Sequence, residues 1–204
     1  MKRKSHVWVL VIALVVLAGS LWKTCVAVTA QNRIKEDLLY KSFHSMIGIS
    51  RDLESLITAI ETESIQYEEC EQKLTTISQQ FAELHVSQTL YAKHFPPRKI
   101  SRSSYASFPD FTFVGDTLVG GWGELDGVAY KGITVDNAIS AKEVQFLVAL
   151  KEDVDQMIQA LGVADEIYRL REDISVYAVD NVIDVFFENW SWRDSESLLY
   201  YLAE

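Results

Sequence analysis

The stretch NRIKEDLLYKSFHSMIGISRDLESLITAIETESIQYEECEQKLTTISQQFAELHVSQTLYAK, residues 32–93, decides the fold of this chain. With Leu39 at position a of a heptad, thirteen of the sixteen a and d positions are apolar or aromatic. Such a 3.5-residue period predicts a helix with a continuous apolar seam. No proline precedes Pro96. We therefore expect one long, coiled-coil-like helix over residues 31–95.

The residues beside the seam indicate how this helix packs. Its e and g positions are mostly small or neutral, whereas a parallel two-stranded coiled coil usually carries opposite charges there. Small flanks favour the close approach of another helix of the same chain. We therefore predict a mainly α fold, in which the long helix packs against shorter C-terminal helices as an antiparallel hairpin or bundle. A parallel homodimer is the alternative.

The N-terminus carries a targeting segment. A basic leader, residues 1–6, precedes an apolar run over residues 7–22 that tryptophans bracket, and indole rings prefer the membrane interface. We interpret the run as an uncleaved transmembrane signal anchor, with the N-terminus cytoplasmic by the positive-inside rule and the C-terminal domain extracytoplasmic. The alternative is a signal peptide cut near Ala30, which would give a secreted protein.

The net charge of −10 is distributed unevenly along the chain. It amounts to +4 over residues 1–31, −1 over residues 32–102 and −13 over residues 103–204. An acidic C-terminal half disfavours nucleic acid as a partner, because carboxylates repel phosphates. The expected partners are the membrane, through residues 7–22, and another membrane or envelope protein.

Two d positions interrupt the pattern. Glu63 would be costly to bury without a partner, so we expect a solvated stretch there. Cys70 is interpreted as a small buried hydrophobe. The alternative is an interchain disulfide across a parallel dimer, because Cys25 lies 45 residues away along the expected helix and is too distant to pair with it.

Residues 96–136 change in character, with glycines among aromatic and β-branched residues. We predict a loop and a small three-stranded β-like insert at the tip of the long helix. The expected strands are residues 111–114, 117–125 and 128–135. The pairs Gly115-Asp116 and Asp126-Gly127 suit tight hairpin turns between them.

The same insert carries the alternative function. Its carboxylates, Asp110, Asp116, Glu124 and Asp126, could serve a metal ion or a hydrolase within residues 110–127. Their order matches no helix-loop-helix calcium motif, and the His and Cys spacings match no metal or catalytic motif. We therefore expect no catalytic residue, metal or cofactor; an enzyme or metal-binding protein, secreted or anchored, is the alternative.

Residues 140–204 are expected to form helices that pack on the long one. Ser140 and Glu143 form a capping box, Gly162 ends that helix, and Asp165 can cap a second helix before a last short one. The aromatic end of the chain is a candidate interaction surface, because aromatic side chains dominate binding hot spots. Its residues are Phe186, Phe187, Trp190, Trp192, Tyr200 and Tyr201. We favour packing of this end on residues 43–57 of the long helix; an exposed interaction surface is the alternative.

These features together predict a membrane-anchored, extracytoplasmic helical protein. We expect it to act without catalysis, by protein–protein interaction, as a scaffold, an assembly component or a sensor-like module.

Overall fold

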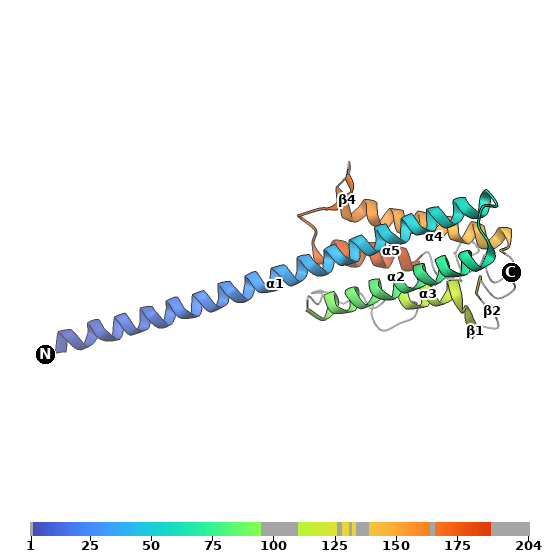
Figure 1. The fold of residues 1–204 in the computed structure, drawn as a ribbon. Coiled ribbons are helices and arrows are strands. Elements are labelled where there is room, and N and C mark those ends of the chain that lie inside the picture. Colours follow the sequence, from blue (N-terminus) through green and yellow to red (C-terminus); the bar gives the residue numbers. More distant parts are fainter. Residues whose placement is uncertain are drawn as a thin grey trace. The chain divides into compact units, whose positions relative to one another are not determined.

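The computed structural model describes residues 2–94, 110–125, 128–130, 132–133, 139–163 and 166–188. The chain divides into two units, Met1–Asp37 and Leu38–Glu204. The first unit is helical where it is described, and the second is a helical bundle with two short β-hairpins (Figure 1). The mainly α prediction is confirmed.

The predicted single helix over residues 31–95 is wrong, because the chain turns back in its middle. Helix α1 spans Lys2–Glu61 and helix α2 spans Tyr67–His94. At the end of α1 the Ser64 N–H donates to the Ala59 carbonyl and the Glu63 N–H donates to the Ile60 carbonyl, each at 3.0 Å. This pattern is a Schellman motif. Glu63 occupies its left-handed position with φ of 51°, and its side chain is exposed as expected.

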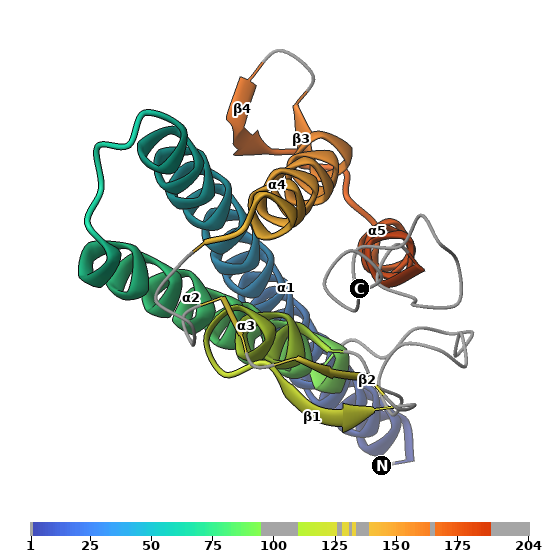
Figure 2. The same cartoon turned by 90° about the vertical axis from the view of Figure 1, so that its right-hand side faces the viewer.

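The reversal allows the apolar seam to bury itself. Helices α1 and α2 lie side by side and antiparallel (Figure 2), with Lys73 Nζ donating to Ser55 Oγ at 2.8 Å. The heptad register is the same before and after the turn at residues 62–66. The a and d positions therefore face inward on both helices. Those fully shielded from solvent are Met46, Ile49, Leu53, Leu56, Leu74, Ile77, Phe81 and Leu84. Burying each such side chain contributes about 1.5–3 kcal/mol, which an isolated single helix could not gain.

Residues predicted as the first strand of the insert form a helix instead. Helix α3 spans Phe111–Val119, and Asp110 caps it by accepting a hydrogen bond from the Phe113 N–H at 3.0 Å. Gly115, predicted in a hairpin turn, lies inside α3 against α2; a Cβ added there would be 2.9 Å from the Ser78 carbonyl oxygen. Burial against α2 therefore overrides the β-propensity of this segment.

The other two predicted strands pair only in part. Strand β1, Trp122–Leu125, is antiparallel to β2, Val128–Tyr130, with Leu125 opposite Val128. The sheet has two strands in the described residues, not three. After β2, the Ile133 N–H donates to the Leu118 carbonyl at 3.2 Å. Gly132 has φ of +94°, and a Cβ there would lie 2.6 Å from the Val119 carbonyl oxygen, so glycine is required.

Helix α4, Ala141–Leu161, begins and ends where its sequence signals predict. Glu143 N–H donates to Ser140 Oγ at 3.2 Å, and Ser140 N–H donates to Glu143 Oε2 at 2.7 Å, which completes the capping box. Helix α4 runs antiparallel to α1, where Ser50 donates a hydrogen bond to Asp155. Lys151 also donates to Asp155, at 2.7 Å, and this hydrogen bond raises the pKa of Lys151.

The helix predicted from Asp165 is wrong over its first turns. Strand β3, Gly162–Val163, pairs with β4, Glu166–Leu170, in an antiparallel hairpin. Tyr168 in β4 is 71% exposed, and the hydrogen bonds of the hairpin replace those of the expected helix in this segment. Helix α5, Val176–Glu188, begins after it and packs against α4. The predicted last helix lies outside the described residues.

Candidate functional site

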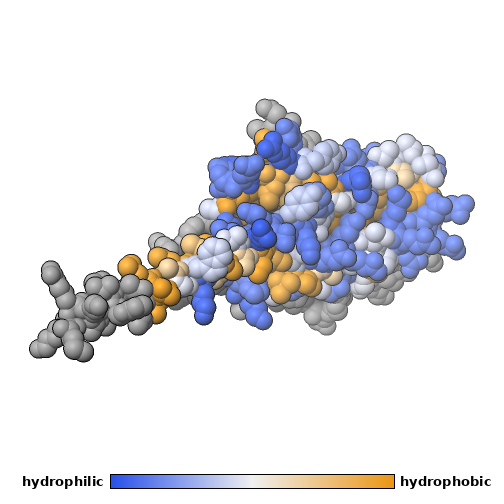
Figure 3. Space-filling model, turned by 60° about the vertical axis from the view of Figure 1, so that its left-hand side comes forward, coloured by the Kyte–Doolittle hydropathy of each residue, from blue (hydrophilic) through white to orange (hydrophobic). Residues whose placement is uncertain are grey.

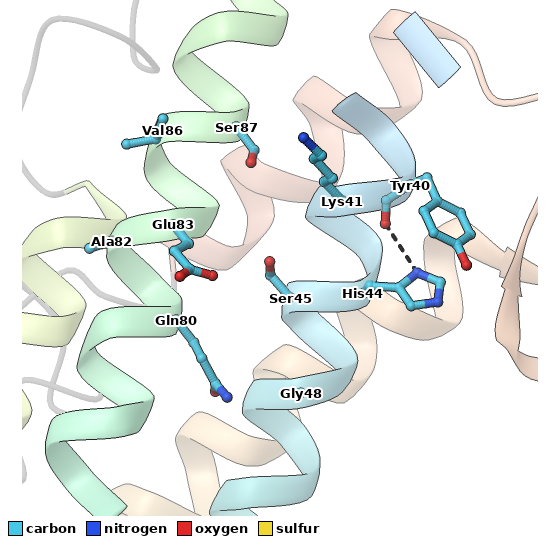
Figure 4. A pocket seen from close by; sticks show the side chains of 10 residues that line it. All are labelled: Tyr40, Lys41, His44, Ser45, Gly48, Gln80, Ala82, Glu83, Val86 and Ser87. Atoms are coloured by element: carbon cyan, nitrogen blue, oxygen red, sulfur yellow. Dashed lines mark hydrogen bonds between the residues drawn. The ribbon is translucent and has the colours of Figure 1, made fainter. Parts of the chain in front are cut away.

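A groove lies between α1 and α2 on the surface of the bundle, with a volume of about 790 Å³. Figure 4 shows its two walls, one from each helix. Its lining residues are Tyr40, Lys41, His44, Ser45 and Gly48 from α1, and Gln80, Ala82, Glu83, Val86 and Ser87 from α2. We refer to these ten residues as the α1–α2 groove.

Small side chains open this groove above the buried seam. Gly48 carries no side chain and lies opposite Gln80; a Cβ at position 48 would be in van der Waals contact with Gln80 Nε2, at 3.5 Å. Ser45, Ala82 and Ser87 add little volume to either wall. The seam residues between the helices are well packed, whereas the outer edge of the helix pair is hollow.

The polar residues of the groove stand at three levels, about one helical turn or 5.4 Å apart. Lys41 lies at the first level, and Ser45 and Glu83 face each other at the second (Figure 4). Gly48 and Gln80 meet at the third level. The levels follow from the spacing of residues 41, 45 and 48 along α1, which places them on one face of the helix.

Gln80 contributes a buried acceptor to the third level. Its Nε2 donates to Asp52 Oδ2 at 2.7 Å, which holds the amide in place. Its Oε1 is buried and accepts no hydrogen bond within the described part of the chain. A buried polar atom without a partner costs about 1–3 kcal/mol. This oxygen lies beneath the surface of the groove and is not accessible to solvent.

The groove also carries two opposite charges and two exposed apolar groups. Neither Lys41 nor Glu83 has an ion-pair partner among the residues that the structure describes. Tyr40 and Val86 are each 56% exposed. The Tyr40 ring lies 3.9 Å from the ring of His44 between centroids. The accessible surface of the groove thus combines an apolar rim with one positive and one negative side chain.

The predicted aromatic surface is placed mainly in the core, as far as it is described. Phe186 is 1% exposed and Phe187 is partly buried. Their rings lie 5.3 and 4.9 Å from that of Phe111 in α3, between centroids. Phe186 also lines a cavity of about 200 Å³ between α4 and α5. The remaining members of the predicted surface lie outside the described residues: Trp190, Trp192, Tyr200 and Tyr201.

Cys70 lies in the core, as its interpretation as a buried hydrophobe implies. It is 1% exposed, and burial raises the pKa of its thiol to about 11. Both Cys25 and Cys70 are free thiols. An interchain disulfide through Cys70 would require α2 to separate from its neighbours, because the thiol does not reach the surface.

The carboxylates of the predicted acidic insert are used for structure or lie apart. Asp110 caps α3, and Asp116 is exposed on that helix. Glu124 belongs to β1, and Asp126 lies outside the described residues. Within the described ranges, no group of three or more His, Cys, Asp and Glu side chains is arranged to hold a metal ion.

Sequence reasoning did not identify the α1–α2 groove. One signal was present, because Ser45, Gln80 and Ser87 are the small or neutral g positions of the heptads. Without the turn at residues 62–66, nothing in the sequence places residue 45 beside residue 83. No protein-family model, curated protein or solved structure matches this chain.

Proposed function

We propose that this chain is a single-pass membrane protein whose extracytoplasmic helical bundle acts without catalysis, by binding another protein. The role would be that of a scaffold, an assembly component or a sensor-like module. The proposal combines an anchor at one end of α1 with a binding groove on the bundle.

One observation supports the membrane anchor: helix α1 has an exposed apolar part and a buried apolar part. Large apolar side chains are exposed along the N-terminal part of α1, as Figure 3 shows in orange. They are Leu14, Val15, Val16, Leu17, Leu21, Trp22, Val26 and Val28. This part of α1 contains a segment long and apolar enough to cross a membrane. Exposed leucine and valine are stable in lipid and costly in water.

The proposed orientation in the membrane follows from the basic residues at the N-terminus. Lys2, Arg3 and Lys4 precede the apolar run, and basic residues beside a span stay on the cytoplasmic side. The bundle would then lie outside the cytoplasm, where its acidic surface keeps it soluble.

Two measurements test the anchor and its orientation. Mass spectrometry of the mature protein should recover the N-terminal peptide, uncleaved at Ala30. A C-terminal reporter that is active only outside the cytoplasm should be active, and one that is active only inside should not. A mature N-terminus after Ala30 would contradict the anchor.

A further test separates binding from enzymatic function. Asp110, Asp116, Glu124 and Asp126 would be changed together to the corresponding amides. Asparagine remains a good helix cap at position 110, so α3 should still form. We expect an unchanged phenotype with an unchanged unfolding temperature. Loss of a cellular phenotype in the folded variant would favour the enzymatic or metal-binding alternative.

A further inference from the structure

The chemistry of the α1–α2 groove specifies the kind of partner that it can hold. Lys41 offers a cation at the first level, and Glu83 offers an anion at the second. The two levels are about one helical turn apart. An occupant must therefore present an anion and a cation at the same spacing.

An α-helix supplies that spacing directly. Side chains three or four residues apart lie on one face of a helix, about one turn from each other. A helix lying along α1 and α2 would place an Asp or Glu against Lys41, and a Lys or Arg three or four residues away against Glu83.

The rim of the groove fits the same occupant. Tyr40 and Val86 expose apolar surface on either side of the charges, and Gly48 and Ala82 leave room for close approach. An amphipathic helix buries its apolar face in such a groove and is recognised by anchors at i, i+3, i+4 and i+7.

A second copy of this chain fits less well in a parallel arrangement. Two copies related by a two-fold axis parallel to the helices keep each level opposite itself. Lys41 would then face the first level of the other copy, where it meets Lys41 or Ser87 rather than Glu83. The charges that complement each other stand one turn apart, so the groove is not self-complementary in that arrangement.

We propose that the α1–α2 groove binds one amphipathic helix of a different protein, which carries an acidic and a basic residue three or four positions apart on its bound face. This inference rests on the proposed protein-binding function and names its site and partner.

Photo-crosslinking in cells tests the inference with the full-length protein. Benzoylphenylalanine would replace Val86 in the groove and, as a control, Tyr168 in β4, which is 71% exposed. We expect an adduct with another polypeptide from position 86 and not from position 168. Peptide mapping should place the adduct in a helix with the acid–base spacing.

Charge variants make the test specific. Lys41→Glu and Glu83→Lys should each lower the adduct yield about fivefold, as expected when a partly exposed ion pair worth about 1 kcal/mol is lost. Lys142→Glu and Glu152→Lys change the same charges on the exposed surface of α4 and should leave the yield unchanged. Circular dichroism would check that all four variants fold.

The contrary outcomes are distinct. An adduct between two copies of this chain, or a mapped helix without the acid–base pair, would overturn the inference. A foreign adduct from position 168 alone would refute the groove but leave the proposed function standing. No foreign adduct from either position would contradict both.

Discussion

At the scale of single residues, Gly115 sets the distance between α2 and α3. A Cβ at this position would lie 2.9 Å from both the carbonyl oxygen and Oγ of Ser78, closer than real Cβ contacts. Hydrophobic residues surround the contact, so backbone shifts would spread into the core.

We expect Gly115→Val to lower the free energy of unfolding by about 1–3 kcal/mol through overpacking. Gly120→Ala is the matched control, because a Cβ at that position meets nothing nearer than 3.8 Å. Urea denaturation followed by circular dichroism measures both. Equal midpoints for the two variants would show that α3 does not pack on α2 as described.

Cys70 gives a second test at this scale. Burial raises the pKa of its thiol from 9.0 to about 11, and only the thiolate reacts with alkylating reagents. In a Cys25→Ser variant at pH 8, the native protein should react about a hundredfold more slowly than the urea-unfolded chain, from the pKa difference alone. Rapid labelling of the native protein would contradict the burial of this thiol.

The same pKa shift predicts a pH dependence of stability. Below pH 9.0 the thiol is protonated in both states and contributes nothing. Above pH 9.0 the unfolded chain loses this proton more readily than the folded protein, whose pKa is about 11. Stability should therefore fall as the pH rises between these values.

At the scale of the elements, the turn between α1 and α2 depends on one unfavourable backbone conformation. Glu63 has φ of 51° at the position of a Schellman motif that glycine usually occupies. A left-handed conformation costs an L-residue about 1–2 kcal/mol, and a β-branched residue more.

Glu63→Gly should raise the free energy of unfolding by up to about 1 kcal/mol, because relief of strain exceeds the entropy of glycine in the unfolded chain. Glu63→Val should lower it. The difference in thermal midpoint between the two variants measures the strain. A lower midpoint for the glycine variant than for the valine variant would mean that α1 and α2 do not turn at this residue.

The helices differ in how well their bounds could be predicted from the sequence. Helix α4 was predicted at both ends because its capping box and Gly162 act through local hydrogen bonds. Helix α3 was missed because Phe, Thr and Val favour strands, and its burial depends on Ser78 and Phe81 of α2. The start of α5 was missed because β4 pairs with β3 before it.

At the scale of the whole molecule, helix α1 has an exposed apolar part and a part that is buried in the bundle. Residues 14–28 of α1 expose apolar side chains, whereas residues 39–57 include much of the core of the bundle. We expect that arginine in the first part disrupts membrane insertion while the bundle still folds.

Val15→Arg with Leu17→Arg should release the chain from membranes, since each arginine near the centre of a span costs about 2.5–3.5 kcal/mol. Extraction with alkaline carbonate measures the fraction retained. Val86→Arg, on the exposed surface of α2, is the control and should remain in the membrane pellet. Retention of the double variant would contradict the anchor.

The sequence by itself determined the features that depend on nearby residues. These are the apolar run at the N-terminus, the heptad seam whose a and d positions are largely buried, and the bounds of α4. Only the tertiary structure decided what the seam packs against, because the reversal at Glu63 brings residues 38–61 and 67–94 together. The α1–α2 groove is likewise a feature that only the tertiary structure decided. Gly48 and Gln80 are distant in the chain, and their contact exists only because burying the seam outweighs the cost of the turn.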